Sequence, residues 1–380
     1  MAPYLIAFLF SSALFQFGGL AEFKHGNAKA AFLLYGFAFL PLCILAGARD
    51  LSVGTDTGGY GIFLFDQGMS STSFGSYVEA LDNSTWDVAP LYAFVTYLVV
   101  RIFQSQIIYF AAIELFVVFP VFIVCRKLCP QRIGISMLLY LLVFFIPSLN
   151  MMRQSASMGL AVLAVEAFVD GKKLKATLWL ICAVSIHYSA IIAVLFCLMW
   201  FALVKRDKMG AVTQRPQARF VIFVLVVLVF AVMLFFQQIA EALGHLDGFG
   251  RLFLYATHSG SKLSSSGLVY DVLLIFGSLS IAFHLHGSGA LRVRYYALLV
   301  SLSFAFFCLS GIDNTISRMM SFCTIFFIPL ASILLNRFGY RNVPAGFLLL
   351  ICACLFRFFV CYGLQGFGDA VPYTSTVLGI

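Results

Sequence analysis

The chain has 380 residues, of which 62% are hydrophobic and only 11% are charged, against about 25% charged in an average soluble domain. This composition excludes a soluble globular protein and predicts a polytopic membrane protein of the all-α class. Because one crossing takes about 20 apolar residues, there is room for about 10 to 12 spans in a single membrane domain over residues 1–380.

The net charge of +8 is distributed in a way that argues against a nucleic-acid partner. Most Lys and Arg residues lie in short connections between apolar runs, such as "RKLCPQR" at 126–132 and "KKLK" at 172–175. The positive-inside rule places these connections in the cytoplasm. The ten cysteines lie mostly inside the apolar runs and form no CxxC pair, so we predict neither a metal site nor a disulfide framework.

In chain order, the apolar runs predict spans at 3–18, 30–47, 89–104, 107–124, 133–149, 152–170, 219–239, 267–286, 295–311, 319–335 and 344–363. The polar connections expected on the outer side are about 48–88, 241–266 and 312–318. One conflict remains, because two full crossings between 89 and 124 would put "RKLCPQR" outside. The piece at 89–104 is therefore expected to be re-entrant, or a crossing is hidden in the preceding acidic loop.

The run from Ala176 to Val204 has basic clusters at both ends and is too long for one ordinary span. A re-entrant helical hairpin explains both features, since each arm of about 12 residues would rise about 18 Å, short of a hydrocarbon core of about 30 Å. Its tip falls at "SIHYSA" and places His187 within the membrane toward the outer side.

The stretch "NMMRQSASM" at 150–158 puts polar residues at the outer start of a helix. Pro147 favours a break before it, Asn150 is a candidate N-cap, and Arg153 and Gln154 fall in the first turn. A guanidinium beside a helix N-terminus is suited to an anion such as phosphate. The alternative is an interfacial arginine that contacts lipid phosphates.

Two other segments put arginines on the same outer side. "ARDLSVGTDTGGY" at 48–60 offers Arg49 and Asp56 in a polar, glycine-rich loop, and "IDNTISRMM" at 312–320 carries Arg318. Singly, the first is explained by an acidic turn and the second by a lipid anchor. Together with Arg153 and His187 they predict a site for a diphosphate attached to a lipid, whose tail would lie between spans.

These motifs resemble a known family. "RDLSVGTDTGGY", "NMMRQSASMGLAVL", "SIHYSAIIAVL" and "ISRMMSFCTIFFIPL" have the order and spacing of the EpsG-like members of the Wzy-type polysaccharide polymerases. The resemblance covers residues 49 to about 330. One departure is Asp87 in "TWDVAPLY", where family members often have a glutamate.

The resemblance implies a multi-pass enzyme of the bacterial inner membrane that lengthens O-antigen, capsule or exopolysaccharide. It would move a growing chain from undecaprenyl diphosphate onto the next lipid-linked repeat unit at the periplasmic face. The implied architecture is similar to the lipid-dependent glycosyltransferases of the GT-C class, needing no nucleotide sugar, metal or other cofactor. A protein that sets chain length is an implied partner, besides the lipid-linked oligosaccharides and membrane lipids.

The expected site follows from both lines of reasoning. Arginines Arg153, Arg318 and Arg49 would hold the diphosphate, and Asp56 or His187 would take the proton from the acceptor hydroxyl. Tyr60, Gln154 and Ser189 are weaker candidates for binding sugar hydroxyls. Arg357, deep in an apolar run, is either a fourth arginine at the diphosphate or an ion-pair partner of Asp271.

Two other functions use similar residues. An O-antigen ligase would share the donor and the arginines but use another acceptor, such as the lipid A core. A flippase or transporter of lipid-linked sugars needs cationic grooves and no base. A transporter is expected to show pseudo-repeats between its two halves, and the sequence has no such symmetry.

Overall fold

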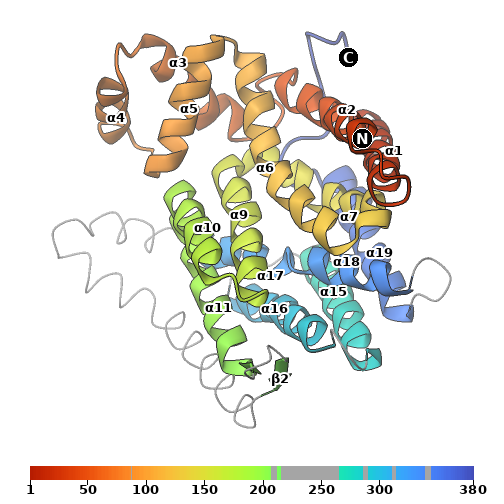
Figure 1. Cartoon of the computed structure of the whole chain (residues 1–380). Helices are drawn as coiled ribbons and strands as arrows, with labels where there is room; N and C mark the ends of the chain where they lie inside the picture. The colour runs from red at the N-terminus through yellow and green to blue at the C-terminus, as the bar shows by residue number, and fades with distance from the viewer. Residues whose placement is uncertain (87, 207–211, 215–264, 286–289, 310–313, 339–343) are drawn as a thin grey trace.

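The computed structural model describes the whole chain except residues 87, 207–211, 215–264, 286–289, 310–313 and 339–343. The fold is almost entirely helical (Figure 1). The first half contains α1 (Ala2–Phe23), α2 (Ala28–Gly47), η1 (Thr57–Gly61), α3 (Ile62–Ser70), α4 (Phe74–Asp82), α5 (Pro90–Phe103), α6 (Gln106–Leu128), η2 (Pro130–Arg132), α7 (Ile133–Tyr140), η3 (Leu141–Phe145), α8 (Ile146–Asn150) and α9 (Met152–Val169). The second half contains α10 (Lys173–Ile186), η4 (Tyr188–Ile191), α11 (Ile192–Leu203), β1 (Val204–Arg206), β2 (Val212–Gln214), α15 (Ser265–His284), α16 (Ala290–Leu309), α17 (Asn314–Thr324), α18 (Phe327–Phe338), α19 (Ala345–Phe356) and η5 (Arg357–Leu364).

Eight helical segments of the described residues are long and apolar enough to cross a membrane. They are Ala2–Phe23, Ala28–Gly47, Gln106–Leu128, Pro130–Asn150, Ser266–His284, Ala290–Cys308, Arg318–Phe338 and Ala345–Leu364. The prediction of an all-α polytopic membrane protein is therefore confirmed. The predicted span 219–239 and Asp87 lie outside the described residues, as do residues 241–264 of the predicted loop 241–266 and part of the loop 312–318. The last two residues of the first of these loops begin α15.

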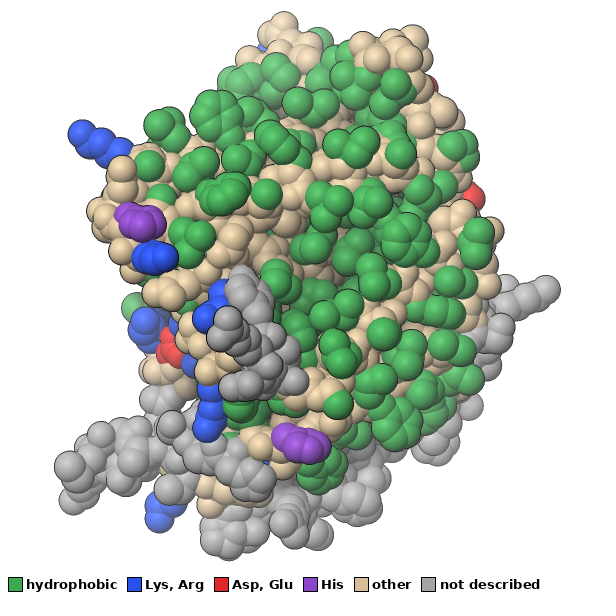
Figure 2. Space-filling model, turned by 90° about the vertical axis from the view of Figure 1, so that its right-hand side faces the viewer, with side chains coloured by type: hydrophobic (Ala, Val, Ile, Leu, Met, Phe, Trp, Pro, Cys, Tyr) green, Lys and Arg blue, Asp and Glu red, His purple; other side chains and the backbone are tan. Residues whose placement is uncertain are grey.

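The outer surface of the bundle carries large apolar side chains. Figure 2 shows hydrophobic side chains over a broad face, with Lys and Arg side chains gathered near one edge. Phe32 and Phe283, for example, are 79% and 75% exposed. Burial of such a surface in water-free lipid is favourable at about 25 cal/mol per Å², so this face is suited to contact with the membrane.

The conflict at residues 89–124 is resolved by α5. This helix has 14 residues, about 21 Å, and is not among the eight candidate spans. The chain leaves α2, forms the short helices α3, α4 and α5, and only then enters the 23-residue α6. Because α5 does not count as a crossing, the "RKLCPQR" connection lies at the same end as the α1–α2 turn, where Arg126 pairs with Glu22 of α1.

The segment after α9 forms two short arms, as the re-entrant prediction requires. Helix α10 has 14 residues and α11 has 12, with η4 between them, and neither is among the eight spans. Both arms pack against α9. The arms are followed by an antiparallel β1–β2 pairing in register Val204 with Gln214, a feature that the sequence analysis did not predict.

Helix α9 lies inside the bundle and packs against α6, α10, α11 and α17. Of its 18 residues only Arg153 and Phe168 are not buried. Gly159 allows the close approach of α6, since a Cβ there would lie 3.1 Å from Pro120 Cβ. The small residues of this helix therefore serve helix packing, and a polar α9 is tolerated because protein, not lipid, surrounds it.

Candidate functional site

The first loop, residues 48–61, is held in place by the C-terminal segment of the chain. The backbone N–H of Gly54 donates to Asp369 O at 2.9 Å, and that of Asp50 donates to Thr374 O at 3.1 Å. Gly54 has a φ of +90°, and a Cβ at this position would lie 2.6 Å from Asn150 Oδ1. The loop thus needs glycine here and is shaped by residues more than 300 positions away.

Arg49 is packed beneath this loop and is only 5% exposed. Its guanidinium donates to Ala46 O and to Thr57 Oγ1, contacts Met152 Sδ at 3.7 Å, and lies 4.5 Å from the ring centre of Phe110. Since its donors are used inside the protein, Arg49 stabilises the loop from below. Its predicted place among the arginines that contact diphosphate stays a prediction.

The start of α9 differs from the predicted cap. Met151 is the N-cap and makes no side-chain cap hydrogen bond. Asn150 is instead the last residue of α8, where its side chain donates to Gly368 O and accepts from Thr55 Oγ1 at 3.4 Å. The prediction of Asn150 as N-cap is wrong because this side chain joins the first loop to the C-terminal segment.

Arg153 projects from the first turn of α9 over the first loop. Its guanidinium carbon lies 4.7 Å from the ring centre of Tyr60, a cation–π contact. Tyr60 is 3% exposed, and its hydroxyl donates to Asn150 O at 3.2 Å. Tyr60, predicted to bind sugar, therefore supports Arg153 and sits at the N-terminus of α9, where the prediction had placed an anion.

Arg318 lies on α17 next to α9. The side-chain amide of Gln154 donates to the carbonyl oxygen of Arg318 at 2.8 Å. The Arg318 side chain is exposed. Gln154, also predicted to bind sugar, is 3% exposed, so its amide nitrogen links α9 to α17 and positions the second arginine.

His187 stands in extended backbone between α10 and η4, outside the eight candidate spans. Its Nε2 is buried and has no hydrogen-bond partner in the described part of the chain. Burial first, and then the positive charges of Arg153 and Arg318, lower the pKa of His187 to about 4. The imidazole is therefore neutral at physiological pH and offers a nitrogen to a ligand.

Asp56 completes the group. Burial raises the pKa of this half-buried carboxyl, and the charges of Arg318 and Arg153 oppose that rise. The same two arginines thus act on both Asp56 and His187, which come from segments 131 positions apart. We call these four residues, Arg153, Arg318, Asp56 and His187, the Arg153 centre.

Ser189 lies in the η4 turn, two residues after His187, and is half-buried. Its predicted role in binding sugar hydroxyls stays a prediction. Among the described residues no group of three or more His, Cys, Asp or Glu could hold a metal ion. The chemistry available to the Arg153 centre is that of fixed positive charges beside a neutral base.

The profile of the EpsG family matches residues 32–375, nearly the whole chain. The chain belongs to the EpsG family. No curated protein and no solved structure matches the chain. Membership of the EpsG family supports a function of the polysaccharide-polymerase type and confirms the resemblance carried by the four motifs.

The sequence did not predict that the C-terminal segment of this EpsG-family chain contacts the first loop. Residues 366–376 bind the first loop and Asn150, and Tyr373 OH donates to Leu45 O at 3.1 Å. The available signal was the segment "GFGDAVPY", since glycines and a proline after the last apolar run are typical of an ordered turn.

Proposed function

We propose that this EpsG-family protein is a polysaccharide polymerase that joins two lipid-linked glycans. It transfers a growing chain from undecaprenyl diphosphate to a hydroxyl of a lipid-linked repeat unit at the periplasmic face of the bacterial inner membrane. The observation that carries the proposal is the convergence of Arg153, Arg318, Asp56 and His187 at one end of a membrane-spanning bundle.

In the proposed reaction the acceptor oxygen attacks the anomeric carbon of the donor sugar. The bond from that carbon to the diphosphate oxygen breaks, and its electron pair leaves with undecaprenyl diphosphate. Arg153 and Arg318 stabilise the negative charge that develops on this leaving group, in a site where low dielectric strengthens the interaction. The cation–π contact with Tyr60 keeps Arg153 in place before substrate arrives.

His187 takes the proton of the acceptor hydroxyl in this proposal. A neutral imidazole with an unpartnered Nε2 accepts a hydrogen bond from a hydroxyl directly. Asp56 then serves as the counter-charge that keeps the two arginines oriented. If Asp56 is the base, the reaction is otherwise unchanged, so the two assignments are separated by mutation.

The proposal also covers the surroundings of the enzyme. The architecture is of the GT-C kind, the substrates are undecaprenyl-diphosphate-linked oligosaccharides of O-antigen, capsule or exopolysaccharide, and a chain-length regulator is a partner. The apolar face of Figure 2 supports contact with membrane lipids.

The test uses purified protein in nanodiscs, its lipid-linked repeat unit, no nucleotide sugar, and EDTA. Wild type is expected to make a ladder of products, and Arg153→Ala is expected to reduce the rate by about 10²- to 10³-fold, as loss of one oxyanion donor does elsewhere. Arg126→Ala is the matched control, because Arg126 pairs with Glu22 at the other end of the bundle.

Each alternative outcome assigns a different function. No ladder from an authentic repeat unit rejects the polymerase. A single transfer to a lipid A core acceptor indicates a ligase, and movement of intact lipid-linked sugar across the bilayer without a new bond indicates a flippase. If the Arg153→Ala variant still makes a ladder, the polymerase function stands but the Arg153 centre is not its site.

A further inference from the structure

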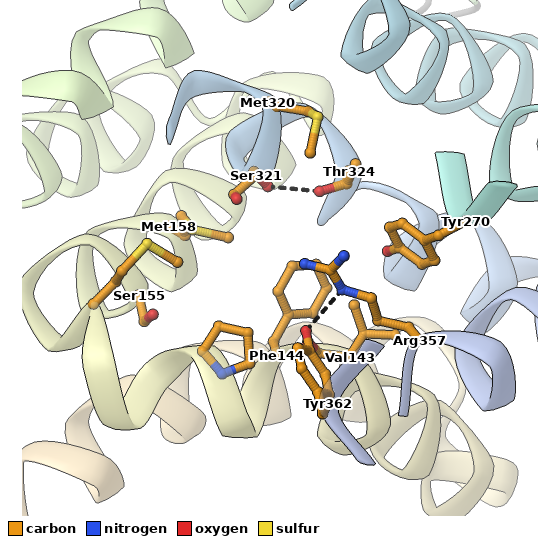
Figure 3. A pocket seen from close by; sticks show the side chains of 12 residues that line it. Val143, Phe144, Ser155, Met158, Tyr270, Met320, Ser321, Thr324, Arg357 and Tyr362 are labelled. Carbon is orange, nitrogen blue, oxygen red and sulfur yellow. Dashed lines mark hydrogen bonds between the residues drawn. The ribbon is translucent and has the colours of Figure 1, made fainter. Parts of the chain in front are cut away.

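A pocket next to the Arg153 centre contains another arginine. Arg357 begins η5 and lines a hollow together with Ser155, Ser321, Thr324, Tyr270 and Tyr362 (Figure 3). In Figure 3 its guanidinium lies between Tyr270 and Phe144 and faces the centre of the pocket. A guanidinium this deep in an apolar run is costly unless protein or a ligand compensates it.

Aromatic rings fix the orientation of Arg357 and leave most of its donors unused. Its Nε donates to Tyr362 OH at 3.0 Å, and Tyr362 OH in turn donates to Val143 O at 2.6 Å. The ring centres of Tyr270 and Tyr362 each lie 5.0 Å from the guanidinium carbon. The two terminal amino groups make no hydrogen bond to any described residue.

The nearby carboxylate does not occupy the pocket. Asp271 on α15 acts electrostatically with Arg357 and is 0% exposed. It does not line the hollow, and neither of its oxygens has a hydrogen-bond partner in the described ranges. The pocket therefore keeps the positive charge of Arg357 and N–H donors that no described residue uses.

The walls of the pocket suit a phosphate group on an apolar chain. Ser155 and Ser321 offer hydroxyls, and the methionines Met158 and Met320 are adaptable apolar surface. A guanidinium binds two phosphate oxygens at once, and hydroxyls supply further donors. No carboxylate lines the described pocket to repel such an anion.

The pocket shares two helices with the Arg153 centre. Ser155 follows Arg153 by two residues on α9, and Ser321 follows Arg318 by three on α17. At a rise of 1.5 Å per residue the offsets along these helices are about 3 and 4.5 Å. The Arg357 pocket and the Arg153 centre therefore lie at similar heights along α9 and α17.

We propose that the Arg357 pocket is a second phosphate site, which holds the diphosphate of the second lipid-linked substrate while Arg153 and Arg318 hold that of the first. This inference rests on the proposed function, because a reaction between two lipid-linked glycans brings two diphosphates into the protein at once. The apolar walls accept the first part of the isoprenoid chain.

The test counts undecaprenyl diphosphate molecules bound per protein, by native mass spectrometry from nanodiscs of neutral phosphatidylcholine. Wild type is expected to bind two. Arg357→Met, which has similar length and no charge, is expected to weaken one of the two by about 10- to 100-fold. Arg126→Met is the matched control and keeps both.

Size-exclusion chromatography and thermal unfolding would reveal a folding defect in Arg357→Met. Two milder variants, Ser321→Ala and Arg357→Lys, then test the same site. Both keep the cation and are expected to weaken the same ligand by a smaller factor, since Lys lacks the planar fork of Arg. A second arm adds phosphatidic acid. Displacement of one undecaprenyl diphosphate by this lipid at equal concentration overturns the substrate assignment and makes the pocket a phospholipid site.

Different results would overturn the second phosphate site and the polymerase function. A wild type that makes a ladder but binds a single undecaprenyl diphosphate, or an Arg357→Met variant that binds two with unchanged affinity, overturns the second site alone. A wild type that makes no ladder rejects the polymerase, and this is measured independently of the binding count.

Discussion

Two groups of charged residues lie near the two ends of the 18-residue α9, with Arg153 and Glu166 about 20 Å apart along the helix. At the C-terminal end of α9, Glu166 forms ion pairs with Lys127, at 2.9 Å, and with Arg292. Asp170 forms ion pairs with the same two residues, at 2.5 Å and 3.3 Å. We call these four residues the Glu166 cluster. At the start of α9, Arg153 and Arg318 act on Asp56 and His187, and no ion pair within 4 Å joins Asp56 to a described residue.

The two groups differ in how their described side chains are paired. The Glu166 cluster balances two cations with two anions and adds a hydrogen bond from Tyr296 OH to Glu166. It ties α6, α9 and α16 together and leaves little for a ligand. The Arg153 centre keeps an exposed Arg318 and a His187 nitrogen without a partner among the described residues. Similar residue types thus form a paired cluster at one end of α9 and, at the other end, the site that we propose for the substrate.

The largest expected effect concerns the base. His187→Asn is expected to lower kcat by about 10²- to 10⁴-fold, the usual contribution of general acid–base catalysis, and Asp56→Asn by less. Because the neutral imidazole is the active form, wild-type kcat/KM should fall only as pH drops toward about 4, the lowered pKa of His187. The measurement is the rate of ladder formation against pH for both variants and wild type.

Two results would reverse this assignment. If Asp56→Asn is more damaging than His187→Asn, the base is Asp56. If the acid limb of kcat/KM lies near the ordinary histidine pKa of about 6.5, the positive surroundings of His187 do not act as described. In the bound complex a diphosphate raises the pKa of His187, so the acid limb of kcat is expected at higher pH than that of kcat/KM.

Substitutions in the Glu166 cluster are expected to lower the free energy of unfolding and to leave the catalytic rate unchanged. Glu166→Gln removes one of the two carboxylates that Lys127 and Arg292 share. It is expected to cost about 2 kcal/mol, less than a fully broken buried pair, because Asp170 still pairs with both cations and the Lys127 side chain is 38% exposed. Reversible unfolding in mixed micelles measures this cost, and the rate per folded protein should be unchanged.

The matched control for that variant is Arg126→Gln. Its side chain is 44% exposed in the pair with Glu22, so the loss is expected to be about 1 kcal/mol or less. Equal losses in the two variants would mean that the Glu166 cluster has no special part in holding α6, α9 and α16 together.

The smallest expected effect is at Gln154. Gln154→Leu removes the hydrogen bond to Arg318 O and is expected to cost about 1 kcal/mol of substrate binding, because it positions an arginine without touching the reacting atoms. KM should rise several-fold while kcat changes little. A large loss of kcat with unchanged KM would instead place Gln154 in contact with the reacting sugar, as the sequence had suggested.

Much of the Arg153 centre was predictable from local chemistry. Basic connections assign one end of the bundle, so the polar residues left at the other end, including Arg153, Arg318 and His187, were expected to lie at one depth. The two short helices α10 and α11 agree in length with the predicted arms of about 12 residues each, and their re-entrant placement in the membrane stays a prediction. Such reasoning could not show which hydrogen-bond donors of each side chain are used within the protein itself.

Arg49, Asn150 and Tyr60 illustrate this limit. Each looked suited to a ligand or a cap, and each contacts a residue that is distant in the sequence. Arg49 contacts Phe110, Asn150 contacts Gly368, and Tyr60 contacts Arg153. The pairing of Asn150 with Gly368 joins residues 218 positions apart. No local pattern reports such a contact.

By itself the sequence determined the membrane class, the family and the end of the bundle at which chemistry is expected, because hydropathy, charge and motif order are local properties of the chain. Only the tertiary structure decided that the C-terminal segment closes over the first loop, and that Arg357 faces a pocket lined by Ser155 of α9 and Ser321 of α17. These depend on packing between remote segments, where the hydrogen-bond partners of buried polar groups are settled.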